Sequence, residues 1–191
     1  AKEAKIDIIT RTTAPQGNMT IRHTLRRYAD IVATTTVKAT SAETATTLTV
    51  KNPKLWSPES PTLYNLTTEV LIDGHPVDST WQRHGPQVGR VGIRTLGWCG
   101  KNGFLLNGKP YKIKGVCEHD DAAIEGAAKS IATMRFRIGL LKKMGCNAIR
   151  TAHNPFAAEF YDLCDEMGML VMNEFFDGWY VPKADGDFGH E

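Results

Sequence analysis

The feature that most constrains this chain is a unit that occurs twice in its second half, in which a helical pattern ends at a Met-Gly pair and a short apolar run follows. The first pair is Met144-Gly145, followed by the run Cys146 to Ile149. The second pair is Met167-Gly168, followed by the run Met169 to Met172. Glycine commonly ends a helix in the left-handed conformation, and a short continuous apolar run is typical of a strand buried on both faces. Two such units in succession predict parallel strands joined by right-handed crossovers.

Both helical patterns have an apolar face. Ser130 is a favourable N-cap for the first helix, whose apolar residues are Ile131, Met134, Ile138, Leu141 and Met144. The second helical region opens at Pro155, and its apolar residues are Phe160, Leu163, Cys164 and Met167. This spacing places each set on one side of a helix. We therefore expect both helices to pack against the parallel strands.

Titratable residues stand where each predicted strand ends. His119 follows a first strand that begins at Gly115. Arg150 and His153 follow the second strand, and Glu174 follows the third. Chemistry at the carboxyl ends of parallel strands is how a β/α barrel builds a site, but a closed barrel needs eight strands. The chain is therefore either a short open α/β sheet or a piece of a larger TIM barrel, and we expect the piece.

The first half of the chain is rich in Thr, Val and Ile and predicts antiparallel β-structure. The candidate strands are Met19 to Arg27, Ile31 to Val37, Thr46 to Val50, Tyr64 to Ile72, His75 to Trp81 and Val91 to Leu96, with Asp73-Gly74 as a hairpin turn. Their spacing suggests an immunoglobulin-like β-sandwich, although fewer strands are visible than a full seven-stranded domain needs. The run Ala1 to Gln16 is weakly patterned and is interpreted as a frayed remnant. We expect residues 1–98 to form the sandwich and residues 99–191 to form about three βα units of the barrel.

A further hairpin is expected between the two halves. Phe104 to Leu106 and Tyr111 to Lys114 are separated by Asn107-Gly108, which is a strong signal for a two-residue turn. The segment from Leu55 to Tyr64 has a different character, because two prolines within it forbid regular strand pairing. We expect an extended crossing there, held to the core by the aromatic residues Trp56 and Tyr64.

Composition excludes some classes of partner and site. The formal net charge is +2 and no basic stripe with interleaved aromatic residues is present, so nucleic acid is not expected. No apolar run approaches the ~18 residues of a membrane-spanning helix, so no membrane is expected. The cysteines Cys99, Cys117, Cys146 and Cys164 form no C-x-x-C pair. The last three lie beside apolar residues in predicted elements, and we expect buried free thiols.

Several motifs occur in an order that is specific for one family. They are Leu55 to Pro58, Gly103 to Pro110, Gly115 to Asp120, Met144 to Pro155 and Phe160 to Gly168. Together they resemble glycoside hydrolase family 2 and, within it, the bacterial β-galactosidases. The resemblance covers roughly Lys51 to Trp179. It implies a retaining enzyme with a sugar-binding jelly roll, an immunoglobulin-like sandwich and a TIM barrel, of which this chain would be a fragment.

The resemblance also implies roles for the residues at the strand ends. His119 and His153 match histidines that bond the sugar, Arg150 matches an arginine that supports this wall, and we expect Glu174 to pair with Arg150. The family's two catalytic glutamates follow the fourth and seventh strands and lie about 5 Å apart. Asn173-Glu174 resembles the acid/base pair but follows the third strand. We therefore expect no catalytic residue in this chain and no activity of the isolated chain.

The chain departs from the family pattern at several positions. Cys117 stands where many members carry Asn, while Ala152 and Asn154 stand where Ser and Tyr are common. The Glu and His with which some members bind a divalent ion are not evident after Glu174, so we expect no metal and no cofactor.

The resemblance favours hydrolysis of terminal β-D-galactosides by the parent enzyme. A β-glucuronidase or β-mannosidase of the same family is the alternative, and a non-catalytic carbohydrate-binding or scaffold fragment is an alternative of another class. The expected partners are the β-galactoside substrate and the remainder of the parent enzyme. The sequence leaves open the compartment, a bacterial cytoplasm or periplasm, and whether the parent is a homo-oligomer.

Overall fold

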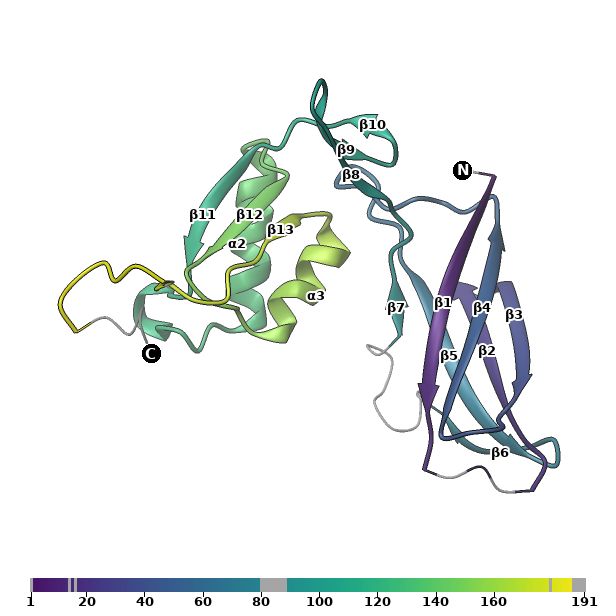
Figure 1. The fold of residues 1–191 in the computed structure, drawn as a ribbon. Coiled ribbons are helices and arrows are strands. Elements are labelled where there is room, and N and C mark those ends of the chain that lie inside the picture. Colours follow the sequence, from purple (N-terminus) through teal and green to yellow (C-terminus); the bar gives the residue numbers. More distant parts are fainter. Residues whose placement is uncertain (1, 14, 16, 80–88, 179, 187–191) are drawn as a thin grey trace. The chain divides into compact units, whose positions relative to one another are not determined.

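The computed structural model describes residues 2–13, 15, 17–79, 89–178 and 180–186 (Figure 1). The chain forms two compact units. The first comprises Ala1–Trp56 and Thr62–Ile93, and the second comprises Ser57–Pro61 and Arg94–Glu191. No helix among the described residues is long and apolar enough to cross a membrane.

The first unit is a β-sandwich, and each of its sheets is antiparallel. One sheet pairs β1 (Glu3–Arg11) with β4 (Glu43–Lys51). The other has the order β3-β2-β5-β6, with β7 paired to β5. Its strands are β2 (Met19–Arg27), β3 (Asp30–Lys38), β5 (Tyr64–Ile72), β6 (His75–Ser79) and β7 (Arg90–Val91). Apolar side chains from both sheets fill the space between them, among them Leu25, Leu48, Val50 and Tyr64.

The interpretation of the first residues as a frayed remnant was wrong. They form β1, in which exposed and partly buried residues alternate along the strand. Ile6 and Ile8 pack against the core cluster, while Lys5 and Asp7 face outward. This is the period-two pattern of a half-buried strand. The charged residues within it made the pattern look weak.

Two other strand predictions need correction. Val91 to Leu96 is not one strand, because β7 ends at Val91 and β8 (Leu96–Cys99) begins five residues later in the second unit. The strand predicted from His75 is described as far as Ser79, and the positions predicted beyond it lie outside the described residues.

The proline-rich segment forms a tight turn where we expected an extended crossing. Ser57 and Ser60 exchange two backbone hydrogen bonds of 3.0 Å, which close the turn. The aromatic residues at its ends are pinned as predicted, since Trp56 is 1% exposed and Tyr64 is 2% exposed. The prolines do forbid a regular strand, but a turn satisfies that restriction as well as an extended crossing does.

This turn belongs to the second unit and is held there by a lysine side chain. Lys142 Nζ donates to the carbonyl oxygens of Pro58 and Gly168, each at 2.9 Å. Gly168 has a φ of +77°, and a Cβ atom there would lie 2.4 Å from the Pro58 oxygen. Glycine is required at this position both for its conformation and for the close approach of the turn.

The second unit contains a hairpin and a parallel sheet. The hairpin of β9 (Gly103–Leu106) and β10 (Lys109–Pro110) belongs to a three-stranded antiparallel sheet of order β10-β9-β8. The Asn107-Gly108 turn lies where predicted, with both φ angles positive. The predicted position of the returning strand was wrong, because β10 comprises Lys109–Pro110 and residues 111–114 form no strand.

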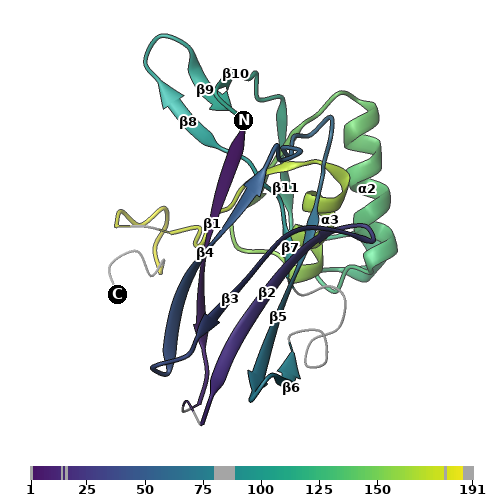
Figure 2. The same cartoon turned by 90° about the vertical axis from the view of Figure 1, so that its right-hand side faces the viewer.

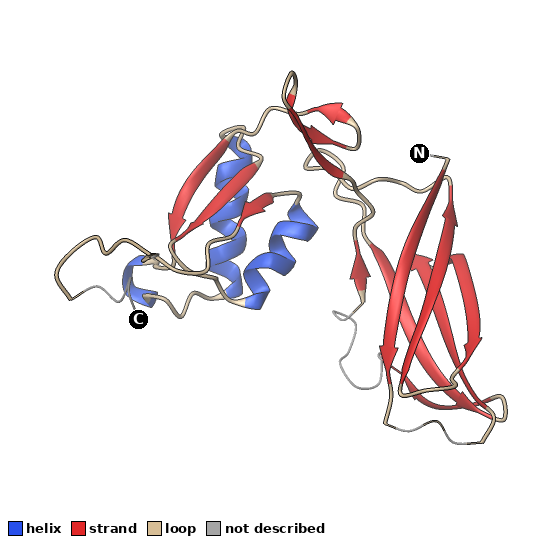
Figure 3. Cartoon of the chain, in the orientation of Figure 1, coloured by secondary structure: helices blue, strands red, loops and turns tan. Residues whose placement is uncertain are grey.

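The parallel sheet has the order β11-β12-β13, with β11 (Gly115–His119), β12 (Ala148–Ala152) and β13 (Leu170–Met172). A short 3-10 helix, η1 (Ala123–Glu125), follows β11. The crossovers are α2 (Ile131–Lys143) and α3 (Ala158–Met167), which lie on one side of the strands (Figures 2 and 3). The predicted parallel strands with crossover helices are therefore confirmed.

The helix signals act as expected, with two exceptions at the ends of α2. The Ser130 side chain accepts a hydrogen bond from the Thr133 backbone nitrogen, and Gly168 ends α3 in the left-handed conformation. Met134 and Ile138 are buried against the sheet. The predicted stripe was too long, however, because Ile131 and Met144 at the two ends of α2 are exposed.

The register of the parallel strands assigns their side chains to two faces. Val116, Ile149 and Val171 are aligned and pack against the core under the helices. Cys117 and Arg150 are aligned in the next row and point to the opposite face, because side chains alternate along a strand. This second face delivers side chains to the candidate site.

The cysteine prediction holds only in part. All four cysteines are free thiols, and Cys164 is buried, which raises the pKa of its thiol. Cys117 is exposed and Cys146 is only partly buried, although both were expected to be buried. Cys117 lies on the sheet face that the helices of this chain do not cover, so an apolar neighbourhood in the sequence did not imply burial.

Candidate functional site

The four residues singled out in the sequence come together at the carboxyl edge of the parallel sheet. His119 is the last residue of β11, and Arg150 lies within β12. His153 directly follows β12, and Glu174 stands two residues beyond β13. Because the three strands run parallel, their carboxyl ends meet at one edge. The predicted convergence of these side chains is therefore observed.

Arg150 and Glu174 form the base of this group. Nε and Nη2 of Arg150 lie 2.8 Å and 2.6 Å from Oε1 of Glu174. Nη1 of the same guanidinium donates to Cys117 Sγ at 3.3 Å. Contacts with Cys117 and Glu174 raise the pKa of Arg150 above its ordinary value. Partial burial opposes ionisation of Glu174, but hydrogen bonds with Arg150 and His153 outweigh it and keep the pKa of its carboxyl below the usual range.

His153 links this pair to His119. Its Nδ1 lies 3.0 Å from Glu174 Oε2, 3.4 Å from Arg150 Nη2 and 3.6 Å from Asp177 Oδ1. The shortest contact assigns the proton of a neutral ring to Nδ1, donating to Glu174, which leaves Nε2 as an acceptor. The rings of His119 and His153 meet edge to face, with centroids 5.5 Å apart and an interplanar angle of 81°. The peptide bond before His153 is cis.

A network that the sequence did not reveal fixes the backbone that carries Glu174. The Glu174 backbone nitrogen donates to the hydroxyl of Thr151, which in turn donates to Asn173 Oδ1, each at 3.0 Å. Tyr161 also donates to Asn173 Oδ1, at 2.6 Å, and accepts from the Phe156 backbone nitrogen at 2.9 Å. The Asn173 side chain thus bonds within the scaffold. The signal in the sequence was a polar residue, Thr151, inside an apolar strand. The structure shows that Thr151 is fully buried.

An open cleft of about 580 Å³ lies above these residues. Its lining comes from the ends of β11 and β12 and from the loops after the three strands: His119, Asp120, Asp121, Ala152, His153, Asn154, Phe175, Phe176 and Asp177. His119 and His153 therefore face the cleft, whereas Arg150 and Glu174 are not part of its lining. A hydrogen bond from Lys183 at 2.5 Å lowers the pKa of Asp177, so this lining residue is held ionised.

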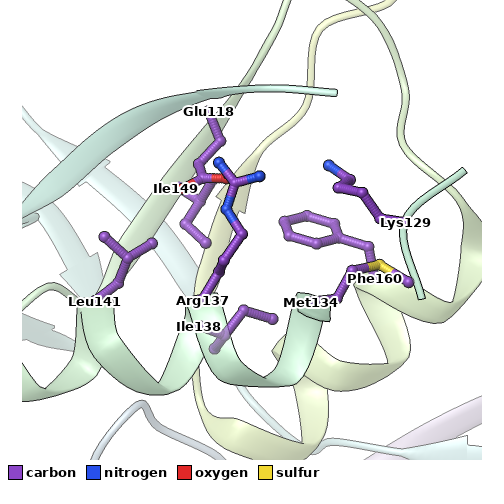
Figure 4. Close-up of a pocket in the computed structure, with 8 residues that line it drawn as sticks. All are labelled: Glu118, Lys129, Met134, Arg137, Ile138, Leu141, Ile149 and Phe160. Atoms are coloured by element: carbon purple, nitrogen blue, oxygen red, sulfur yellow. The ribbon is translucent and has the colours of Figure 1, made fainter. Parts of the chain in front are cut away.

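A second, much smaller pocket lies on the helix side of the sheet (Figure 4). Its volume is about 10 Å³, which is room for about one water molecule. Glu118 and Arg137 pair there at 2.8 Å. This pocket is too small for a substrate, so the open cleft is the candidate functional site.

The described residues show no group of three or more His, Cys, Asp or Glu side chains placed to hold a metal ion. The expectation that the site needs no metal stays a prediction.

A β-sandwich followed by parallel βα units, with polar residues gathered at the carboxyl edge of the strands, is consistent with a β-sandwich domain joined to the start of a TIM barrel. Comparison with known families agrees. Residues 99–178 match the model of the glycosyl hydrolases family 2 TIM barrel domain, and residues 2–87 match a second model of glycosyl hydrolases family 2. The chain belongs to glycoside hydrolase family 2. The resemblance seen in the sequence and the predicted fold class are both confirmed.

Relatives named for two different activities are similar to this chain. A putative β-glucuronidase of Formosa agariphila is 44% identical over 161 residues, which cover 84% of this chain and 15% of that protein. A β-galactosidase of Bacteroides ovatus is 43% identical over 141 residues, covering 74% of this chain and 16% of that protein.

Among solved structures, a glycosyl hydrolase family 2 member from Bacteroides cellulosilyticus superimposes with a TM-score of 0.84 at 29% identity. The superposition covers 99% of this chain and 25% of that one. The chain thus spans about 15% of the length of the first curated relative and about a quarter of the length of this solved structure.

Proposed function

We propose that the cleft binds the terminal sugar of a β-linked galactoside, as part of a retaining glycosidase. The observation that carries this proposal is the pair of histidines at the cleft, whose rings meet at 5.5 Å while Glu174 fixes the outward tautomer of His153. A neutral imidazole donates from one nitrogen and accepts at the other. Two such rings at one edge suit a pyranose, whose hydroxyl groups also donate and accept.

The composition of the lining favours a neutral sugar. The described residues that line the cleft include three aspartates but no Lys or Arg, so they offer no cationic partner to a glucuronate carboxylate. The nearby Lys129 and Lys183 are already paired with Asp120 and Asp177. β-Glucuronides are the second candidate class of substrate, because the relative from Formosa agariphila, 44% identical, is named as a putative β-glucuronidase.

We assign Glu174 a supporting role. A retaining glycosidase needs one carboxyl group as acid/base and a second as nucleophile. The carboxylate of Glu174 is already engaged by Arg150 and His153, and its position follows the third parallel strand. In this proposal Glu174 orients His153 and offsets the charge of Arg150, and both catalytic glutamates come from residues outside this chain.

Ligand titration with the isotope-labelled chain tests the proposal. Methyl β-D-galactoside should shift backbone resonances of residues 119–121, 152–154 and 175–177, and should bind more tightly than methyl β-D-glucuronide. His119→Ala should weaken this binding. Arg135→Ala is the matched control, because its ion pair with Glu166 joins the two helices away from the cleft. Saturable shifts confined to the sandwich would instead support a non-catalytic carbohydrate-binding module.

A further inference from the structure

Lys129 is a buried cation beside the candidate site. Its side chain is 5% exposed, and its Nζ lies 2.7 Å from Oδ1 of Asp120. The same Nζ lies 4.1 Å from the centroid of the Phe156 ring. An ammonium group is costly to bury without such partners, and an aromatic face attracts a cation at this distance. Figure 4 shows the amino end of Lys129 pointing into the small pocket beside Phe160.

The two partners of Lys129 belong to different loops of the cleft. Asp120 directly follows His119, in the loop after β11. Phe156 lies three residues beyond His153, in the loop after β12. One ammonium group therefore contacts the loop that directly follows His119 and the loop that contains His153.

Arg137 provides a contrast. It pairs with Glu118 at 2.8 Å and also donates to the backbone oxygen of Asp121. Both of these contacts lie at β11 and the loop after it, so they fix one side of the cleft. Lys129 differs because its contacts join the loop after β11 to the loop after β12.

We propose that Lys129 is a positioning residue that sets the spacing of the His119 and His153 rings. Its ion pair with Asp120 holds the first loop, and its contact with the Phe156 ring holds the second. The consequence for sugar binding rests on the proposed function of the cleft. The spacing of the two rings does not depend on the proposed function, because it can be measured without a sugar.

The first experiment uses the whole chain with labelled histidines. Lys129→Met keeps an unbranched apolar side chain but removes the charge. We expect the cross-relaxation peak between the His119 and His153 rings to weaken or disappear. Arg135→Met, which removes an exposed ion pair between α2 and α3, should leave this peak unchanged. A folded Lys129→Met chain with a peak of full strength would overturn the proposal.

The second readout is sugar affinity. Misplaced binding groups lose affinity steeply, so Lys129→Met should weaken binding of methyl β-D-galactoside by about tenfold or more. If the wild-type chain binds no sugar, and the Lys129→Met variant loses the contact between the two rings, the proposed function is refuted and the positioning role is kept. Binding that is equal in both chains, with an unchanged ring contact, would refute the positioning role alone.

If the Lys129→Met variant does not fold, Phe156→Leu tests the positioning role of Lys129 instead. This change keeps an apolar side chain and the ion pair with Asp120 but removes the ring face under the ammonium group. We expect the His119–His153 peak to weaken and the resonances of residues 153–156 to shift more than those of 119–121. An unchanged peak in this variant would overturn the proposal.

Discussion

The guanidinium of Arg150 meets the carboxylate of Glu174 through two nitrogens, at 2.8 Å from Nε and 2.6 Å from Nη2. Arg150 lies in β12, and Glu174 lies in the segment after β13, the parallel strand next to β12. The carboxylate's other oxygen lies 3.0 Å from Nδ1 of His153. One carboxylate therefore sets both the charge balance beneath the cleft and the tautomer of a histidine that faces it.

Glu174→Gln should weaken sugar binding without unfolding the chain. Glutamine keeps the shape of the side chain but removes the charge that both partners use, and bonds to charged groups are the stronger ones. We expect the affinity for methyl β-D-galactoside to fall by about tenfold. Glu166→Gln is the control, because Glu166 makes an exposed ion pair with Arg135 between the helices. Equal affinity of the two variants would contradict the role given to Glu174.

The isolated chain should not hydrolyse p-nitrophenyl β-D-galactoside. Glu174 is engaged by two partners, and the catalytic pair is proposed to lie outside these residues. Release of p-nitrophenol by the purified chain is the measurement. Turnover that disappears in Glu174→Gln would mean that Asn173-Glu174 is the acid/base pair after all.

The stability of the sandwich should fall below about pH 6.5 because of His23. This side chain is fully buried, with its Nδ1 2.9 Å from Thr68 Oγ1. Burial lowers its pKa from the ordinary value of 6.5. As the pH falls below that value, the unfolded chain binds a proton that the folded chain does not, so the free energy of unfolding decreases.

Urea unfolding between pH 7.5 and pH 5 measures this effect. His23→Gln should be less stable at pH 7.5 but should lose less stability on acidification than the wild type. His75→Gln changes an exposed histidine of β6 and should unfold with the pH dependence of the wild type. Equal pH dependence in wild type and His23→Gln would contradict the prediction.

Gly168→Ala should destabilise the second unit more than Gly145→Ala does. Both glycines have positive φ angles, which cost an alanine about 1–2 kcal/mol. Only at Gly168 would the new Cβ also meet the Pro58 oxygen, at 2.4 Å, since nothing lies within 4 Å of the Gly145 position. We expect an extra loss of at least about 1 kcal/mol in the free energy of unfolding. Equal losses would mean that the turn moves away freely.

Local signals predicted much of the fold. Ser130, Gly145 and Gly168 mark helix ends through interactions within a few residues, and the structure shows each of them acting there. The strands Met19–Arg27 and Tyr64–Ile72 were predicted with their observed bounds, because their β-branched residues are not interrupted by turn residues.

Features that depend on distant partners were missed. The strand β1 pairs with β4, about forty residues away in the chain, and its own pattern is blurred by charges. The exposure of Cys117 depends on which sheet face the helices cover, which a run of neighbouring residues does not show.

The candidate site divides in the same way. His119, Arg150, His153 and Glu174 were predicted to converge, because each follows or ends a predicted parallel strand. Lys129 and Tyr161 were not singled out, because their roles depend on contacts with Asp120 and Asn173 in other loops. Spacing along the sequence carries no information about such contacts.

The most direct measurement follows the ring resonances of His119 and His153 while methyl β-D-galactoside is added to the chain. The account predicts that both rings shift together in one saturable process with a single dissociation constant. Rings that stay unchanged while the sugar binds elsewhere, or that respond with different constants, would contradict it.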